Sequence, residues 1–323
     1  MIPLRPNPLD PALLEDMRLK LRASFVTAGS GAILRRKLGQ SLDYREHRPY
    51  AFGDDVRHID WRASLRHGGK DDFLVRSFEA EEQFQLLVVM DVSATMRAGM
   101  GEAERVSKME LALWICEALG HLAIREGIRI GLVPLGGFCG QEPVVFAQGG
   151  QIDEQFARFA ERLWLSDAPD AAREVLVGEQ LARLKQSSVT IFITDFYRTD
   201  AAKLAFEEAV QQACRGYRQA VVCELNSWPA ERALLLRDVV SLNAIGSLDG
   251  RAGAFQATAG EVAQADHAIQ AQRDGYAKAL HLGGVVHFPW DLPDRFEHDA
   301  IKTDFPQRFR HFLIRSELFG RAG

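Results

Sequence analysis

The chain has 323 residues, of which 47% are apolar and 26% are charged. This composition is typical of an ordinary globular protein and excludes an intrinsically disordered, collagen-like or coiled-coil chain. Lys and Arg total 39 and Asp and Glu total 44, so the net charge of −5 argues against a generally basic nucleic-acid-binding protein. At roughly 100–200 residues per domain, the length predicts two domains, or one domain with a large attachment.

The apolar runs are much shorter than the roughly 20 residues that a membrane-spanning helix needs. Leu86–Met90 ends at Asp91, and Leu132–Leu135 ends at two glycines. The proline-rich N-terminus lacks the apolar core of a signal peptide, and the four cysteines form no C-x-x-C pair. We therefore expect free thiols, a cytoplasmic location and no insertion into a membrane.

The first 80 residues differ in pattern from the rest of the chain. Apolar residues among charges predict a helix over Pro11–Ser24, and Arg, Asp, His and aromatic residues crowd the segment Arg35–Phe78. No helical or strand period persists there, so we expect short strands with tight turns at Gly53–Asp55 and His67–Gly69. Residues 1–80 are thus predicted to form an N-terminal helix and a β-rich block.

From Phe84 onward strand and helix patterns alternate, which is typical of a parallel α/β sheet. The predicted strands are Phe84–Met90, Arg129–Leu135, Pro143–Phe146, Ser188–Thr194, Gln219–Leu225, one or two within Ala233–Ala244, and Val285–Phe288. The predicted helices are Ser107–Glu126, Asp153–Leu163, Asp170–Lys185, Ala201–Cys214 and Gly260–Leu282. We assign residues 81–290 to this sheet domain.

The last segment, residues 291–323, carries aromatic residues at helical spacing. Phe305, Phe309, Phe312 and Phe319 alternate with basic residues. This spacing predicts a C-terminal helix over Phe305–Phe319 that docks on the core by its aromatic face. Binding of a partner by the same face is the alternative.

The most informative polar residues follow predicted strands. Asp91, Ser93 and Thr95 come directly after one apolar run, and Asp195 follows another, Phe192–Thr194. Neighbouring parallel strands bring their carboxyl ends together, so these side chains can converge on one spot. Carboxylate and hydroxyl oxygens suit Mg²⁺, and Mn²⁺ or Ca²⁺ accept the same ligands. Capping of loops or helix starts is the alternative role for the two aspartates.

The pattern Asp91-x-Ser93-x-Thr95 with Asp195 resembles the metal-ion-dependent adhesion site of von Willebrand factor A domains. The resemblance implies an α/β, Rossmann-like, mostly parallel sheet flanked by helices. It also implies that the first aspartate and the two hydroxyls hold the cation, directly or through water. An acidic residue of the partner supplies the last ligand in that family.

Two further residues stand where the family often has a Gly-Thr-Asp-like turn before a helix. Here the stretch is Leu165–Asp170, which contains no threonine. Ser166 offers a hydroxyl and Asp167 a carboxylate, so the resemblance makes either of them a candidate for the remaining metal ligand.

The N-terminal block also resembles the signature of a known family, the domain of unknown function 58. Those bacterial and archaeal proteins place the block immediately before a von Willebrand A-like domain. The resemblance implies an adaptor that works with an AAA+ ATPase of the MoxR type in the assembly or maturation of other complexes. The matching residues are Tyr44-Arg45-x-x-Arg48-x-Tyr50-x-x-Gly53-Asp54-Asp55-x-Arg57-x-Ile59-Asp60-Trp61-Arg62-Ala63-Ser64.

Motifs of other chemistries are missing from the sequence. There is no G-x-x-x-x-G-K-[ST] phosphate loop, no G-x-S-x-G elbow and no H-E-x-x-H spacing. In the N-terminal block the acidic residues nearly balance the arginines, so we expect a structural charge network and no nucleic-acid partner. ATP hydrolysis by this chain is not expected.

Three functions remain open. The first is a non-enzymatic adaptor that binds partners through the cation site. The second is a phosphatase resembling the haloacid-dehalogenase class with Asp91 as nucleophile, although Ser93 occupies the position where those enzymes carry an aspartate as general acid. The third is a structural scaffold that binds no metal.

Overall fold

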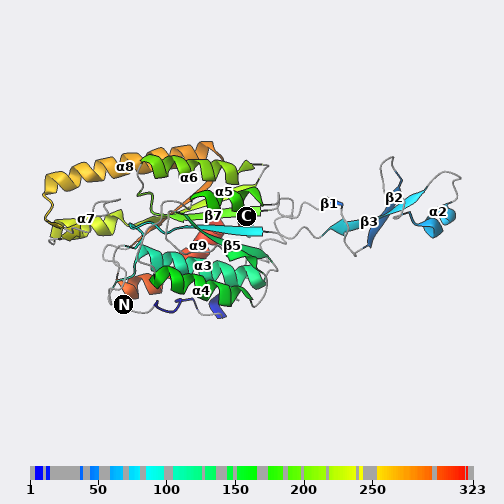
Figure 1. Cartoon of the computed structure of the whole chain (residues 1–323), viewed down its shortest axis with the longest axis horizontal. Coiled ribbons are helices and arrows are strands. Elements are labelled where there is room, and N and C mark those ends of the chain that lie inside the picture. Colours follow the sequence, from blue (N-terminus) through cyan, green and yellow to red (C-terminus); the bar gives the residue numbers. More distant parts are fainter. Residues whose placement is uncertain are drawn as a thin grey trace. The chain divides into compact units, whose positions relative to one another are not determined.

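The computed structural model, shown in Figure 1, divides into two compact units that are described separately. One unit comprises Gly29–Gln83, and the other comprises Met1–Ala28 and Phe84–Gly323. The structure describes residues 4–9, 12–14, 37–38, 44–50, 59–67, 73–80, 85–97, 105–125, 128–135, 144–147, 151–165, 174–184, 188–197, 200–215, 218–237, 240–242, 253–292, 297–316 and 318.

The larger unit is built on a six-stranded sheet with the order β11-β8-β7-β4-β5-β6. Five strands are parallel, and β6 pairs with β5 in the antiparallel direction at one edge. This arrangement confirms the predicted α/β, mostly parallel sheet. The strands are β4 (Gln85–Asp91), β5 (Arg129–Leu135), β6 (Val144–Ala147), β7 (Ser188–Thr194), β8 (Gln219–Asn226) and β11 (Val286–Asp291). A separate pair contains β9 (Val240–Leu242) and β10 (Gly253–Phe255).

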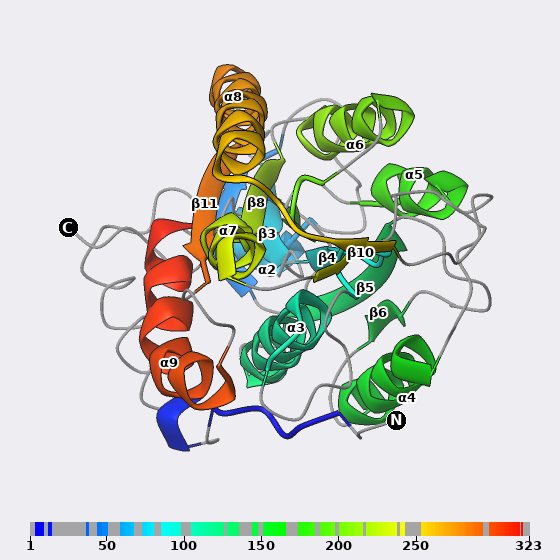
Figure 2. The ribbon, with the colours of Figure 1, turned by 90° about the vertical axis from the view of Figure 1, so that its left-hand side faces the viewer.

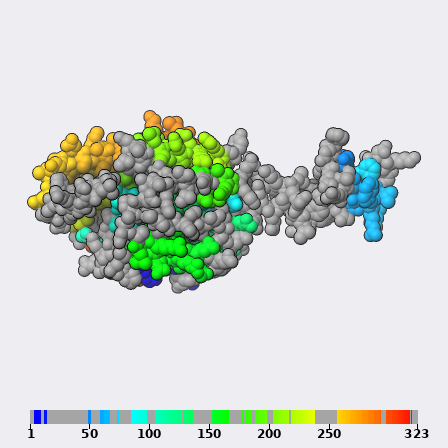
Figure 3. Space-filling view, in the orientation of Figure 1, coloured from blue at the N-terminus to red at the C-terminus, as the bar shows by residue number. Residues whose placement is uncertain are grey.

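The central strands are mostly apolar because helices cover both faces of the sheet. Every residue of β4 and β7 is buried. The helices of this unit are α3 (Lys108–Arg125), α4 (Gln151–Leu165), α5 (Glu174–Ala182), α6 (Asp200–Ala213), α7 (Trp228–Arg237), α8 (Ala259–Leu282) and α9 (His298–Arg315). Figure 2 shows α3, α4 and α9 on one side of the sheet and α5, α6 and α8 on the other. In Figure 3, α4, α6 and α8 reach the outer surface.

The alternation of side chains along the strands creates two apolar clusters. Leu86, Val88 and Met90 of β4 belong to the cluster that contains α3 and α9. Leu87 and Val89 belong to the cluster that contains α5 and α6. Because successive side chains of a strand point to opposite faces, this register also decides which face a polar residue at the strand's end belongs to.

Helix α3 is buried along most of its length because the N-terminal segment covers its outer side. Arg5 forms an ion pair with the buried Glu110, with 2.8 Å between Arg5 Nη2 and Glu110 Oε2. The Trp114 indole N–H donates to the backbone carbonyl of Arg5 (3.1 Å). Leu9 and Leu14 extend the apolar cluster around α3. These contacts group the first residues with the sheet, whereas the sequence pattern groups them with the β-rich block.

Among its described residues, the smaller unit has a three-stranded antiparallel sheet in the order β1-β3-β2 and a short helix. Its elements are β1 (Lys37–Leu38), β2 (Tyr44–Pro49), α2 (Trp61–His67) and β3 (Leu74–Ala80). The helix was not predicted, although Asp60 is a good N-cap: its Oδ1 accepts from the backbone N–H groups of Arg62 (3.1 Å) and Ala63 (3.0 Å).

The predicted C-terminal helix that docks by its aromatic face is confirmed, but two boundaries in the C-terminal third differ from the prediction. The strand expected from Ala233 is instead the last part of helix α7, and only Val240–Leu242 within that segment is described as a strand. The final helix begins at His298, before the predicted Phe305, and has Pro306 in its interior. Residues 233–236 are alanine and leucine, which favour a helix, and a short apolar run does not by itself distinguish a strand from a helix.

Two general expectations can be compared with the described residues. Cys116, Cys214 and Cys223 are free, and Cys139 lies outside the described part. None of the helices described is long and apolar enough to cross a bilayer.

Candidate functional site

The first candidate residue, Asp91, ends strand β4 and is fully buried, with 0% of its surface exposed. Both carboxylate oxygens are held by neighbours. The Ser93 backbone N–H donates to Asp91 Oδ1 (2.9 Å), and the Thr194 hydroxyl donates to Asp91 Oδ2 (2.8 Å). These bonds orient the carboxylate at the carboxyl end of the sheet, where ligands of parallel sheets bind.

The hydroxyls of Ser93 and Thr95 lie close together in the turn after β4. Their oxygens are 3.0 Å apart, and both residues are only partly buried. The turn is closed by backbone bonds from Met96 to Ser93 (3.1 Å) and from Arg97 to Ala94 (3.2 Å). Two hydroxyl oxygens are therefore available beside a fixed carboxylate, at a place that solvent reaches.

Register explains why Thr194 reaches Asp91. Met90 pairs with Ile193 across the sheet, so Asp91 lies opposite Thr194. By alternation, Asp91 and Thr194 continue the face of α5 and α6, and Asp195 continues the face of α3. The sequence pointed to Asp195 as the partner on β7, but Thr194, one residue earlier, makes the contact with Asp91.

Asp195 contacts a lysine. Its Oδ2 lies 2.8 Å from Nζ of Lys108, the first residue of α3. The same ammonium is 3.2 Å from Oε1 of Glu231 in α7. Asp195 is only 4% exposed, and the Lys108 side chain is 3% exposed. Lys108 and Glu231 were not identified from the sequence; a lysine at the start of an otherwise apolar helix was the available signal.

Tyr197 and Ser227 complete this cluster. The Lys108 ammonium lies 4.7 Å from the centre of the Tyr197 ring, within the range of a cation–π contact. The Ser227 hydroxyl donates to Glu231 Oε1 (2.6 Å). Burial and the adjacent Glu231 carboxylate raise the pKa of Tyr197. Burial disfavours the charged form of Lys108, but Asp195 and Glu231 outweigh it and raise its pKa. The lysine is therefore charged.

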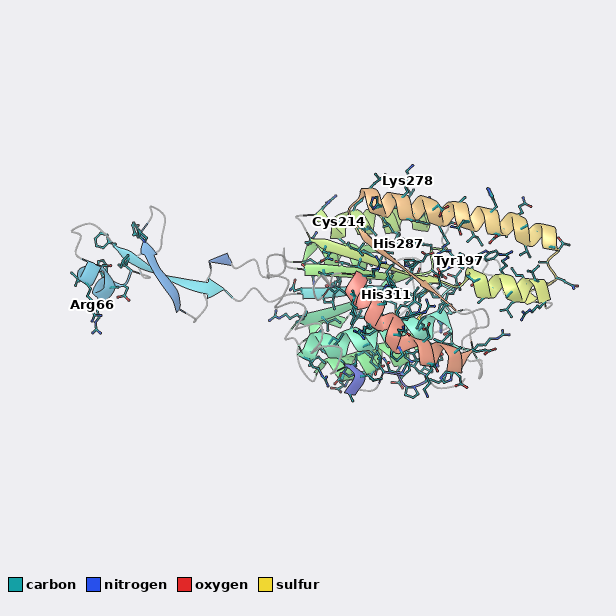
Figure 4. All side chains as sticks on the ribbon, turned by 180° about the vertical axis from the view of Figure 1, so that it is seen from behind. Arg66, Tyr197, Cys214, Lys278, His287 and His311 are labelled. Atoms are coloured by element: carbon teal, nitrogen blue, oxygen red, sulfur yellow. The ribbon has the colours of Figure 1, made fainter. Side chains whose placement is uncertain are left out.

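Between Asp195 and Tyr197 the backbone adopts an uncommon conformation. Phe196 has φ 61°, a region that non-glycine residues rarely occupy. Its ring stacks on Tyr276 at 4.5 Å between centroids, and Gln272 of α8 donates to its carbonyl (3.3 Å). Figure 4 shows Tyr197 toward the end of the sheet where α7 lies. Packing against α8 thus holds the backbone at Phe196, between Asp195 and Tyr197.

The chemistry of these side chains decides which could hold a cation. Asp91, Ser93 and Thr95 fit a hard divalent ion, because they present a carboxylate and two hydroxyls near solvent. Asp195 differs, since an ammonium already neutralises its carboxylate. Ser166 and Asp167 lie outside the described residues. In the part of the chain that is described, no three His, Cys, Asp or Glu side chains gather as a metal-binding group.

Comparison with known proteins adds one finding. A family model described as "Protein of unknown function DUF58" matches residues 46–216, more than half of the chain. The matched segment begins in β2, contains Asp91, Lys108 and Asp195, and ends just after α6. No curated protein matches the chain significantly.

Proposed function

The chain belongs to the DUF58 family, and from this premise we propose that it is a non-enzymatic adaptor that binds a partner's acidic group at the end of strand β4. In this proposal a divalent cation, Mg²⁺, Mn²⁺ or Ca²⁺, joins the two proteins. Asp91, Ser93 and Thr95 are the residues that hold it. The resemblance to von Willebrand A domains, noted from the sequence, supports the same assignment.

The observation that carries the proposal is that the fully buried carboxylate of Asp91 lies beside the hydroxyls of Ser93 and Thr95, which solvent can reach. Burying a carboxylate is costly unless it is hydrogen-bonded or bound to a cation. Ser93 and Thr194 supply hydrogen bonds to Asp91. A divalent ion held by Asp91 would face the surface through the turn at residues 93–95, where a ligand of the partner can reach it.

Each residue has a separate task in this mechanism. Thr194 and the Ser93 amide fix the orientation of Asp91, so that the carboxylate does not need to reorganise when a ligand binds. The Ser93 and Thr95 hydroxyls offer further oxygens on the solvent side. When bound, the metal would provide an open coordination position for a carboxylate of the partner.

The proposed partner is an AAA+ ATPase of the MoxR type together with a client protein that supplies the acidic ligand. Its support is the resemblance of the N-terminal block to the family signature. The chain lacks a phosphate-binding loop of its own, so an ATPase partner would supply the energy of any remodelling reaction.

The proposal is tested by the thermal midpoint of the full chain with Mg²⁺, Mn²⁺ or EDTA. A ligand that binds only the folded state stabilises it by about 2.7 kcal/mol at a hundred times its dissociation constant. We expect cations to raise the midpoint of the wild type and not of Asp91→Asn, which keeps the shape of the side chain. Glu154→Gln, an exposed carboxylate change on α4, is the matched control and should respond like the wild type.

The same proteins should then be compared in capture of the ATPase. Cation-dependent capture that is lost in Asp91→Asn supports the adaptor mechanism. Equal capture with Mg²⁺ and with EDTA would show a scaffold that binds without metal. Turnover of 4-nitrophenyl phosphate that Asp91→Asn abolishes would instead identify a phosphatase, and the non-enzymatic assignment would fall.

A further inference from the structure

The Lys108 cluster contains the elements of a second cation site. Three separate elements contribute to it: the start of α3 gives Lys108, the end of β7 gives Asp195, and α7 gives Glu231. The carboxylate oxygens lie 2.8 Å and 3.2 Å from one nitrogen. Chain segments far apart in sequence therefore place two carboxylates around one positive charge.

Without these two carboxylates, the Lys108 ammonium would be in an unfavourable position. A cation at a helix N-terminus opposes the helix dipole, and a buried ammonium loses its hydration. Asp195 Oδ2 is itself buried, and the Lys108 ammonium, 2.8 Å away, contacts it as an ion pair. The two carboxylates thus need a positive ion between them, and the protein supplies its own.

We propose that Asp195 and Glu231 form a cation site that the Lys108 ammonium fills, and that removing the ammonium converts it into a divalent-metal site. The ligands would be two carboxylates and the neighbouring Ser227 hydroxyl, which suit Mg²⁺ or Mn²⁺. In the native protein Lys108 occupies this site, and strand register places it on the other face of the sheet from Asp91.

The experiment is a Mn²⁺ titration of the full chain, followed by the electron paramagnetic resonance signal of the free ion. Lys108→Met removes the charge with little change in length. We expect it to bind one Mn²⁺ per chain more than the wild type does. The additional ion should be lost in Lys108→Met/Asp195→Asn and retained in Lys108→Met/Asp91→Asn. Lys278→Met, an exposed lysine on α8 labelled in Figure 4, should bind as the wild type does.

The titration distinguishes the site at Asp195 and Glu231 from the proposed site at Asp91, so either site can be absent while the other is present. If the wild type binds no Mn²⁺ but Lys108→Met binds one, the second site is supported and the Asp91 site is not. A folded Lys108→Met that binds no additional ion overturns the inference. So does a wild-type ion that Asp195→Asn removes as completely as Asp91→Asn. Circular dichroism monitors folding, and a Lys108→Met chain that stays unfolded in millimolar Mn²⁺ also counts against it.

Discussion

Glu224 shows how one residue can connect the sheet to a helix. It lies near the end of β8 with a side chain that is 1% exposed, and it contacts Arg273 of α8 through Nε. His287 of β11 lies 2.9 Å from its other oxygen. Burial alone would raise the pKa of Glu224, but the hydrogen bonds and charges of His287 and Arg273 outweigh it and lower the pKa below the ordinary 4.5.

The sign of this shift predicts how stability depends on pH. A carboxylate with a lowered pKa contributes stability that is complete above its unfolded pKa and is lost as pH falls through the folded value. We expect Glu224→Gln to lower the free energy of unfolding by about 3 kcal/mol at pH 7, since Arg273 loses its buried partner. The deficit should shrink as pH falls below about 4.5 and through the lower pKa of the folded state, where the wild type also loses this charge.

Urea unfolding of both proteins between pH 3 and pH 8 measures this difference. Glu154→Gln, at an exposed position on α4, should differ little from the wild type at any pH. A deficit that is equal at pH 3 and pH 7 would mean that the ionised form of Glu224 contributes nothing.

At the scale of elements, helix α3 contains a small defect in packing. Gly120 lies within the helix beside a small apolar cavity. A Cβ added there would be 3.8 Å from Cγ2 of Ile152 in α4, an ordinary van der Waals contact. The cavity is lined by Val88, Cys116, Gly120, Ile130, Gly131, Leu132, Ile152 and Phe156.

Gly120→Ala should therefore stabilise the protein. Replacing glycine by alanine inside a helix gains about 1 kcal/mol, and the added methyl group is also buried against Ile152. Gly275→Ala in α8 is the matched control, because nothing lies within 4 Å of its added Cβ and only the helix propensity changes. Thermal unfolding of the two variants should show the larger gain for Gly120→Ala; a loss would mean that α3 and α4 cannot accommodate the methyl group.

At the scale of the whole larger unit, the C-terminal helix completes one face of the sheet. Phe305, Phe309 and Phe312 of α9 are buried against the same cluster as α3. Trp290 of β11 lies 5.5 Å from Phe305, and Phe288 lies 5.4 Å from Phe312, between ring centroids. The last helix is thus part of the core of this unit, although it is the farthest element in sequence from β4.

Phe309→Ala should consequently destabilise the unit as a whole. Truncating a fully buried phenylalanine typically costs 3–5 kcal/mol, through lost burial and the cavity left behind. Arg310→Ala, the exposed neighbour, should change the free energy of unfolding by less than about 0.5 kcal/mol. Chemical denaturation measures both, and a small effect of Phe309→Ala would show that α9 unfolds separately from the sheet.

The sequence by itself determined the sheet and most of its helices. Mostly apolar runs such as Leu86–Met90 and Val189–Ile193 are typical of strands in the middle of a sheet covered on both faces, so local composition sufficed. Asp91, Ser93 and Thr95 were identifiable for the same reason, because they follow the end of such a run. The short helix α7 and the start of α9 could not be identified from the sequence, since their residues also fit strands or loops.

Only the tertiary structure decided which groups meet at the strand ends. The register between β4 and β7 places Thr194 opposite Asp91, and the packing of α3 and α7 brings Lys108 and Glu231 to Asp195. No spacing in the chain encodes these contacts, because they join residues about 90 to 120 positions apart through the relative placement of helices on a sheet. The sequence therefore shows which charged residues are present, but it does not show which of them pair.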